Sequence, residues 1–210
     1  MSQSASLLIV GAGGHGKVVA DVAVATKRWR HIAFADDRFP EITSVAGLPV
    51  LETAMAAEQL CTQYADVIVA IGDNATRLRT FATLAAAGAH FATIIHPTAS
   101  VSERATLGPG TIVMAQAAVN IESQIASAVI VNTSASVDHD CRISDGAHIS
   151  PGAHLGGGVS VGIGGWVGIG ASVIQQITIG DWAKVGAGAC VVRDVNPDTT
   201  VIGVPATPLL

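Results

Sequence analysis

The apolar positions of the chain follow two different patterns, and the change falls near residue 95. Before it, short apolar runs such as Leu7–Val10 alternate with longer stretches of Ala, Val and Leu at helical spacing. After it, every sixth residue from Val101 to Val191 is Ile, Leu or Val, a period that fits neither an α-helix nor a flat β-strand. We therefore expect two domains, residues 1–94 and 95–192, followed by a C-terminal tail, residues 193–210.

The first pattern predicts an α/β domain. Apolar runs that end in Gly or Asp, and alanine-rich stretches, predict strands at 7–10, 31–35, 67–71 and 91–95 and helices at 16–26, 52–64 and 75–87. Strands that alternate with helices indicate a parallel sheet, giving a small Rossmann-like domain. At about 90 residues, the domain has room for only half of a full dinucleotide-binding fold.

The second pattern predicts a parallel β-helix. Two residues before each large apolar residue lies a second register, which is mostly alanine. One large and one small inward residue per hexapeptide is typical of a three-sided solenoid with about 18 residues per coil. Glycine often follows the large residue, as at Gly108 and Gly156, and we expect these glycines to supply the positive φ angles of the turns.

Composition narrows the class of protein. Half of the 210 residues are hydrophobic and 13% are charged, with a mean hydropathy of +0.51, which argues against disorder. No apolar run approaches the roughly 18 residues of a membrane span, and Met1–Ser6 does not resemble a signal peptide. The net charge of −5 argues against nucleic-acid binding. We expect a cytoplasmic protein with no membrane partner.

The three cysteines form no C-x-x-C pair, so we expect neither a disulfide framework nor a metal site. Cys141 falls in the small inward register and is expected in the core.

A glycine-rich loop, Gly11–Gly16, follows the first strand and opens the first helix. Its backbone amides and the helix N-terminus suit a diphosphate, so Gly13, Gly14 and His15 are candidate ligand residues. Asp36 and Asp37 lie about 20 residues further on, where a dinucleotide-binding fold places its ribose carboxylate. NAD is therefore one possible ligand. A purely structural tight turn is another interpretation.

The sequence Asp138-His139-Asp140 carries the strongest sign of catalysis. His139 lies two residues after the inward Val137, so it should occupy a turn or the outer surface. Histidine is the natural general base near neutral pH, and a neighbouring carboxylate orients it. Asp140 and Asp138 are both possible partners. The alternative is a solvated turn without a catalytic role.

Six motifs along the chain carry a resemblance to a known family. They are, in order, Gly11–Gly16, Phe34–Asp37, Ala70–Asn74, Ile95–Pro97, Asn132–Asp140 and Gly203–Ala206. Together with the hexapeptide repeat, they resemble the sugar acetyltransferases that carry a small nucleotide-binding domain before a left-handed β-helix. These include the N-acetyltransferases of nucleotide-linked 4-amino sugars in bacillosamine and perosamine synthesis, and relatives described as sialic acid O-acetyltransferases.

The resemblance implies roles for particular residues. It makes His139 the general base and Asp140 its orienting acid, and it places Asn132 and His148 near acetyl-CoA and the substrate. In the N-terminal domain it implies a nucleotide-sugar site. The candidate residues for that site are Gly13, Gly14, His15, Asp36, Asp37, Asp73 and Asn74. It also implies a homotrimer with active sites between subunits, acetyl-CoA as co-substrate and no metal.

We therefore expect an acyltransferase of glycan biosynthesis that acetylates the amino group of a nucleotide-linked 4-amino-4,6-dideoxy sugar. Acetylation of a sugar hydroxyl, as in sialic acid, uses the same base chemistry and is the first alternative. An NAD-linked oxidoreductase or sensor, and a non-catalytic trimeric scaffold, are alternatives of other classes.

Overall fold

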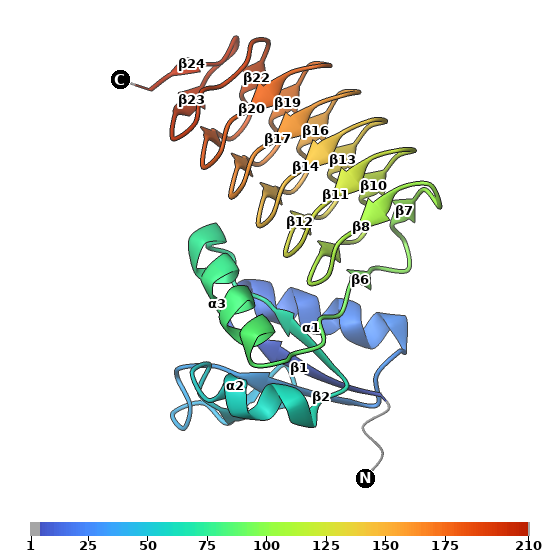
Figure 1. The fold of residues 1–210 in the computed structure, drawn as a ribbon, viewed down its shortest axis with the longest axis vertical. Coiled ribbons are helices and arrows are strands. Elements are labelled where there is room, and N and C mark those ends of the chain that lie inside the picture. Colours follow the sequence, from blue (N-terminus) through green and yellow to red (C-terminus); the bar gives the residue numbers. More distant parts are fainter. Residues whose placement is uncertain (1–4, 210) are drawn as a thin grey trace. The chain divides into compact units, whose positions relative to one another are not determined.

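The computed structural model describes residues 5–209, and the chain divides into two compact units, Met1–Ile94 and Ile95–Leu210 (Figure 1). The first unit is α/β and the second is a parallel β-helix, as the sequence pattern predicts. The fold is of the left-handed kind that the family resemblance implies. Among the described residues, no helix has the length and apolar character needed to cross a membrane.

The first unit is built on a five-stranded sheet in the order β3-β4-β2-β1-β5. Its strands are β1 (Ser6–Val10), β2 (His31–Ala35), β3 (Ser44–Val45), β4 (Leu48–Glu52) and β5 (Asp66–Val69). Strand β1 pairs in parallel with both β2 and β5, and β3 and β4 form an antiparallel hairpin. Because β2 and β5 flank β1 on opposite sides, the loops after β1 and β5 diverge at the carboxyl edge of the sheet. This is where open α/β sheets bind ligands.

Two of the three helices match the prediction, namely α1 (Gly14–Thr26) and α3 (Asn74–Ala86). The helix expected at 52–64 is wrong. Its place is taken by the end of β4, the single turn α2 (Ala57–Leu60) and a 3-10 turn (Cys61–Gln63). Val50 is buried beside the exposed Leu51, the alternation of a strand, and the Thr53 hydroxyl accepts a hydrogen bond from the amide of Ala56. This local turn competes with a continuous helix.

The strand expected at 91–95 is also largely wrong. Phe91 makes only an isolated parallel bridge to Val67, and Ile94–Ile95 forms the short strand β6, which pairs within the solenoid.

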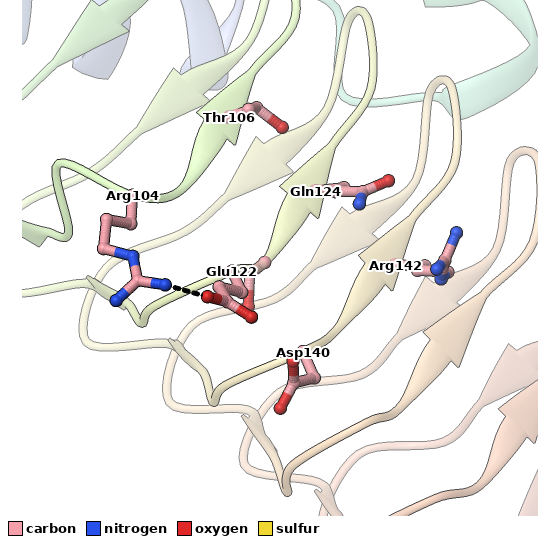
Figure 2. A pocket seen from close by; sticks show the side chains of 7 residues that line it. Arg104, Thr106, Glu122, Gln124, Asp140 and Arg142 are labelled. Carbon is pink, nitrogen blue, oxygen red and sulfur yellow. Dashed lines mark hydrogen bonds and ion pairs between the residues drawn. The ribbon is translucent and has the colours of Figure 1, made fainter.

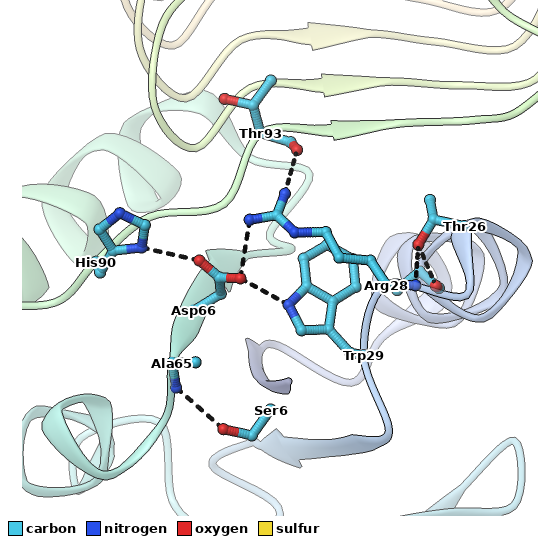
Figure 3. A network of polar contacts seen from close by, with 9 residues as sticks. Ser6, Thr26, Arg28, Trp29, Ala65, Asp66, His90 and Thr93 are labelled. Carbon is cyan, nitrogen blue, oxygen red and sulfur yellow. Dashed lines mark hydrogen bonds and ion pairs between the residues drawn. The ribbon is translucent and has the colours of Figure 1, made fainter. Parts of the chain in front are cut away.

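Asp66 organises the amino edge of the sheet (Figure 3). Its carboxylate accepts hydrogen bonds from the Trp29 indole at 2.7 Å and from the Arg28 guanidinium at 3.0 Å, and lies 2.8 Å from His90 Nδ1. Arg28 also donates to the carbonyl of Thr93. The cluster ties the turn after α1 to the segment that leaves the domain, at the edge opposite the loops that follow β1 and β5.

The second unit is a three-sided prism whose strands have two residues each, except for β23 with three (Figure 1). The eight-stranded face holds β6 (Ile94–Ile95), β9 (Ile112–Val113), β12 (Ile130–Val131), β15 (His148–Ile149), β18 (Trp166–Val167), β21 (Lys184–Val185), β23 (Thr200–Ile202) and β24 (Thr207–Pro208). The six-stranded face holds β7 (Ser100–Val101), β10 (Ala118–Val119), β13 (Ser136–Val137), β16 (His154–Leu155), β19 (Ser172–Val173) and β22 (Cys190–Val191). The five-stranded face holds β8 (Thr106–Leu107), β11 (Gln124–Ile125), β14 (Arg142–Ile143), β17 (Ser160–Val161) and β20 (Thr178–Ile179).

One coil takes 18 residues, because from β7 to β22 strands pair with the strand 18 positions on, as Ser136 does with His154. From β9 to β22 the second residue of each strand is buried, and these residues, Val113–Val191 at six-residue steps, form the core with the small register before them. Cys141 belongs to this core and is fully buried. The stacked aliphatic side chains of the interior stabilise the prism. The outward side chains are therefore the ones that can contact a ligand.

The positive φ angles lie two residues further along each hexapeptide than we expected. They recur at every sixth residue from Gly110 to Gly188, three positions after each large residue, and include Asp140 at 60°. The glycines directly after the large residues serve a different purpose. A Cβ at Gly108 would lie 2.6 Å from the backbone of Ala126 in the next coil. Close approach between coils, and not a left-handed dihedral, requires glycine there.

The segment expected as a C-terminal tail, residues 193–210, is instead part of the prism through Leu209. Strand β23 pairs in parallel with β21, and β24 folds back antiparallel on β23. The reason is that Val201 continues the inward stack and is buried.

Candidate active site

His139 occupies the corner between the six-stranded and five-stranded faces, which we call the His139 corner (residues 138–140). Its side chain is 56% exposed, so it is available to a ligand. Its Nδ1 lies 2.7 Å from Oδ2 of Asp140. Of the two carboxylates that flank His139 in the sequence, the structure therefore pairs its ring with Asp140.

Asp138 serves the backbone of the same corner. Its Oδ1 accepts a hydrogen bond from the amide of His139 at 2.9 Å and another from the Asn120 side chain at 2.8 Å. Asn120 lies one coil earlier, so this contact fixes the turn against its neighbour. The hydrogen bond from Asn120, with that from the His139 amide, lowers the pKa of Asp138.

The Asp140 carboxylate raises the pKa of His139 above its ordinary value of 6.5, and the charge of Asp138 adds to the effect. A carboxylate at Nδ1 stabilises the imidazolium that forms when Nε2 takes a proton. The pair therefore has the chemistry of an oriented general base.

A shallow pocket of about 360 Å³ adjoins this corner on the five-stranded face (Figure 2). Asp140 forms one wall, and the side chains of Gln124 and Arg142 line the strands beside it. Arg104 and Glu122 form an ion pair at its edge. The residues that line the pocket are therefore polar and include both acidic and basic side chains.

Asn132 and His148 form a second polar pair. Asn132 Nδ2 lies 3.0 Å from His148 Nε2. His148 is only 6% exposed, and the Trp166 ring lies beside it with centroids 4.6 Å apart and planes tilted by 51°. The sequence places the two residues separately, and the structure brings them into contact.

The two pairs do not meet within one chain. Asn132 lies at the corner between the eight-stranded and six-stranded faces, which we call the Asn132 corner (residues 132–134). His139 lies at the opposite edge of the six-stranded face. A site that uses both pairs must draw them from two chains.

The glycine loop of the first unit contains two kinds of glycine. A Cβ at Gly16 would lie 2.0 Å from the carbonyl oxygen of Gly11, and Gly11 itself has a φ of 104°. These two glycines are required by the fold. Gly13 and Gly14 have open space where a Cβ would be, so they leave the start of α1 accessible to an anion.

Asp36 is bound to the loop rather than directed at a ligand. Its carboxylate accepts a hydrogen bond from the amide of Ala12 at 2.7 Å and from the Nε of Arg38, also at 2.7 Å. The hydrogen bonds from Arg38 lower its pKa to about 2. Asp37 is exposed, and its carboxylate accepts from the amide of Ala54. Of the two, Asp37 is the more accessible.

Asp73 and Asn74 shape the second loop at this edge. Asp73 caps α3 by accepting from the amide of Thr76 at 2.8 Å. Asn74 accepts from Arg77, whose guanidinium also donates to the carbonyls of Ile71 and Gly72. These contacts hold the loop after β5.

His15 stands at the start of α1 and is half-buried. Burial, with the positive charge of Arg77, lowers the pKa of His15 to about 4. At neutral pH the ring is uncharged, so it can offer a phosphate a hydrogen bond but not an ion pair.

Among residues 5–209, no group of three or more His, Cys, Asp or Glu side chains is arranged to hold a metal ion.

The comparisons with known proteins agree with both units. The family model described as the PglD N-terminal domain matches residues 6–84. The acetyltransferase domain of PglB from Neisseria gonorrhoeae FA1090, solved with acetyl coenzyme A, is 44% identical. It superposes with a TM-score of 0.94, and the match covers 97% of this chain and 98% of that one. This chain belongs to the hexapeptide-repeat sugar N-acetyltransferases. The resemblance seen in the sequence motifs is thereby confirmed.

Two further members of the sugar N-acetyltransferase family extend the match. PerB from Caulobacter crescentus, solved with CoA and GDP-perosamine, is 40% identical with a TM-score of 0.90, covering 98% of this chain and 97% of that one. A UDP-N-acetylbacillosamine N-acetyltransferase from Bacillus subtilis is 40% identical over 116 residues. That match covers 52% of this chain and 51% of the relative, about half of its length.

Sequence reasoning missed the partners that lie one coil away. Asn120 lies 18 residues before Asp138, and Trp166 lies 18 residues after His148. Once the coil length is known, this spacing pairs outward residues as the hexapeptide step pairs inward ones. Arg77 was missed for another reason, because a basic residue within a helix gives no sign that it is buried.

Proposed function

We propose that the protein transfers the acetyl group of acetyl-CoA to the amino group of a nucleotide-linked 4-amino-4,6-dideoxy sugar, with His139 as general base. The main support for this reaction is the 2.7 Å contact between His139 Nδ1 and Asp140. It lies at an exposed corner of the β-helix, the fold that the sugar N-acetyltransferases share. The relatives solved with acetyl coenzyme A, and with CoA and GDP-perosamine, support this choice of substrates.

The chemistry requires one base and no covalent enzyme intermediate. The uncharged amine attacks the thioester carbonyl carbon, and a C–N bond forms as His139 Nε2 removes a proton from the nitrogen. The tetrahedral intermediate then loses CoA thiolate as the C–S bond breaks, and the imidazolium returns its proton to the sulfur. The products are the acetamido sugar and CoA thiol. Asp140 stabilises the imidazolium between the two proton transfers.

The first unit would hold the nucleotide end of the acceptor. Gly13 and Gly14 leave room for a diphosphate at the start of α1, and the uncharged ring of His15 can hydrogen-bond to it. Asp37 is the accessible carboxylate for the ribose or base. We assign Asp36, Asp73 and Asn74 to holding the loops, since each is already engaged by neighbouring groups.

We propose a homotrimer with the active sites between subunits. The His139 corner and the Asn132 corner bound the same face of the prism, so a threefold arrangement sets one corner of each chain against the other corner of the next. Asn132 and His148 of one chain would then face the acetyl donor beside His139 of its neighbour, with CoA in the groove between prisms. We place the reaction in the cytoplasm, within glycan biosynthesis.

The test is release of CoA thiol. The protein is given acetyl-CoA with a panel of UDP-, GDP- and dTDP-linked 4-amino sugars, and free thiol is followed alongside the product mass. We expect release with at least one amino sugar, and His139→Ala should lower kcat/KM by about 10²- to 10⁴-fold. If no amino sugar of the panel causes thiol release, the proposed reaction is wrong. If His139→Ala keeps full activity, His139 is not the general base.

Two controls separate the alternatives. Sugars with a hydroxyl in place of the amine report O-acetylation, because the product is then an ester that mild base hydrolyses. Binding of NAD without any thiol release would favour the oxidoreductase or sensor.

A further inference from the structure

Three consecutive glycines, Gly156–Gly158, form the turn one coil after the His139 corner. The two turns are in direct contact, since the amide of Gly158 donates to the carbonyl of His139 at 2.8 Å. Each glycine meets a different environment. Gly158 has a φ of 71°, the left-handed dihedral of the turn, and a Cβ at Gly156 would lie 2.8 Å from the backbone nitrogen of Gln175.

Gly157 differs from both of its neighbours. Its φ lies outside the left-handed region, so its backbone conformation does not require glycine. A Cβ on Gly157 would lie 2.5 Å from both Cε1 and Nε2 of His139, and 3.1 Å from Cδ2. The nearest obstacle is therefore the imidazole ring itself, which rests on the bare Cα of Gly157.

The same position in the other coils confirms that the turn does not need glycine. Positions one coil apart in this register are Glu103, Ile121, His139, Gln175 and Arg193, and every one carries a side chain of four or more heavy atoms. Glycine occurs only at 157, directly beneath the ring. The imidazole, and not the prism, requires it.

We propose that Gly157 is a positioning residue, whose missing side chain provides the seat that holds the His139 ring against Asp140. The catalytic consequence rests on the proposed function, but the seat itself does not. Filling the seat with a methyl group must move the ring, because 2.5 Å is far inside van der Waals contact. The ring is exposed and can move, so the fold should survive while the contact with Asp140 is lost.

The first test measures the ring without any reaction. The titration of His139 is followed by NMR in the full chain and in Gly157→Ala, with Gln175→Ala as the matched control at the same corner, one coil on. The Asp140 contact raises the pKa of His139 in the parent, so Gly157→Ala should bring it down and Gln175→Ala should leave it unchanged. An unaltered titration in Gly157→Ala overturns the proposal.

The second test is a double-mutant cycle with Asp140→Asn. If Gly157 acts by keeping the ring at Asp140, Asp140→Asn should lower kcat strongly in the parent and little in Gly157→Ala. Gly157→Ala alone should lower kcat by about 10- to 100-fold with small changes in KM, as expected of a misplaced catalytic group. Additive losses would mean that Gly157 acts independently of the pair and would overturn the proposal.

A third test covers the case in which Gly157→Ala folds poorly. In a His139→Ala background the seat is empty, so Gly157→Ala should leave the thermal unfolding midpoint unchanged. A lower midpoint there would show that the backbone itself requires glycine, which contradicts the proposal. If no acceptor sugar releases thiol, the proposed function fails, whereas the titration and unfolding tests still decide the role of Gly157.

Discussion

The imidazole of His139 is oriented by the residue that follows it, since its Nδ1 lies 2.7 Å from the Asp140 carboxylate. Asp140 adopts a φ of 60°, a left-handed conformation that Asp tolerates better than most side chains. That conformation belongs to the turn of every coil, so the prism itself sets the position of the carboxylate. The imidazole meets the carboxylate at one edge and the backbone of Gly157 below. Two neighbours at fixed places thus define the orientation of an exposed ring.

The first prediction concerns pH. His139 must be unprotonated to act as base, so kcat/KM should rise with pH through its pKa, which Asp140 holds above 6.5. Asp140→Asn removes the charge-assisted contact, so the acidic limb should move to lower pH while the maximum rate falls by about 10- to 100-fold. The measurement is the pH profile of thiol release for the two proteins. An acidic limb that stays in place would show that another group titrates.

At the scale of elements, the loop between β1 and α1 is anchored by a carboxylate. The second prediction is that Asp36→Asn lowers the free energy of unfolding at pH 7 by about 2 kcal/mol. Because the folded-state pKa of Asp36 is lowered from 3.8 to about 2, its stabilisation is full above about pH 4 and is lost as the pH falls toward 2. Denaturant titrations of both proteins between pH 2 and 7 should therefore converge at the acid end.

Asp37→Asn is the matched control. The Asp37 carboxylate is exposed, and among the contacts described it accepts one hydrogen bond, from the amide of Ala54. It should change stability by less than about 0.5 kcal/mol. A gap between Asp36→Asn and the parent that persists at pH 2 would contradict the assignment.

The stack of the prism carries the third prediction. Leu155 is 2% exposed in the interior, and Leu155→Ala should lower the free energy of unfolding by about 2 to 5 kcal/mol through lost burial and the cavity it leaves. Ser160→Ala, at an outward position of the next strand, should change it by less than about 0.5 kcal/mol. Both are measured by denaturant unfolding at one protein concentration, because association couples stability to concentration. Equal losses would mean that the inward register is misassigned.

The elements that sequence predicted best are those with many repeats of one rule. An Ile, Leu or Val at every sixth position identifies the inward residue of each strand. Because the same step holds without a shift from Val101 to Val191, each hexapeptide supports the assignment of its neighbours. The helix expected at 52–64 had no such support. Its Ala and Glu residues favour a helix, but the pairing of Val50 with Phe34 and the turn at Thr53 are decided by neighbours that propensity does not describe.

The candidate site divides in the same way. A histidine between two aspartates identifies the corner but leaves both carboxylates open as partners. The family resemblance favours Asp140, and the 2.7 Å contact with His139 Nδ1 agrees with that choice. Likewise, Asp36 and Asp37 look equivalent in sequence, and burial against Ala12 and Arg38 separates them.

At the scale of the whole molecule, the two polar pairs lie at different corners of the prism. Their separation determines how a trimer would assemble its active sites. His139 and Asp140 lie at one edge of the six-stranded face. Asn132 lies at the other edge and contacts His148, which belongs to the adjoining eight-stranded face. If a trimer combines them, a chain that lacks His139 still supplies the second pair to its neighbour. A chain that lacks His148 still supplies the base.

The fourth prediction follows from this arrangement. His139→Ala and His148→Ala should each be nearly inactive alone, and equal mixing of the two chains during refolding should restore about a quarter of the parent activity, since one interface in four then joins two intact partners. The mixture is assayed by thiol release after size-exclusion chromatography confirms trimers, with each variant refolded alone as control. If each active site took both histidines from one chain, every site in the mixture would lack one of them and mixing would restore no activity. An inactive mixed trimer would therefore contradict a site shared between chains.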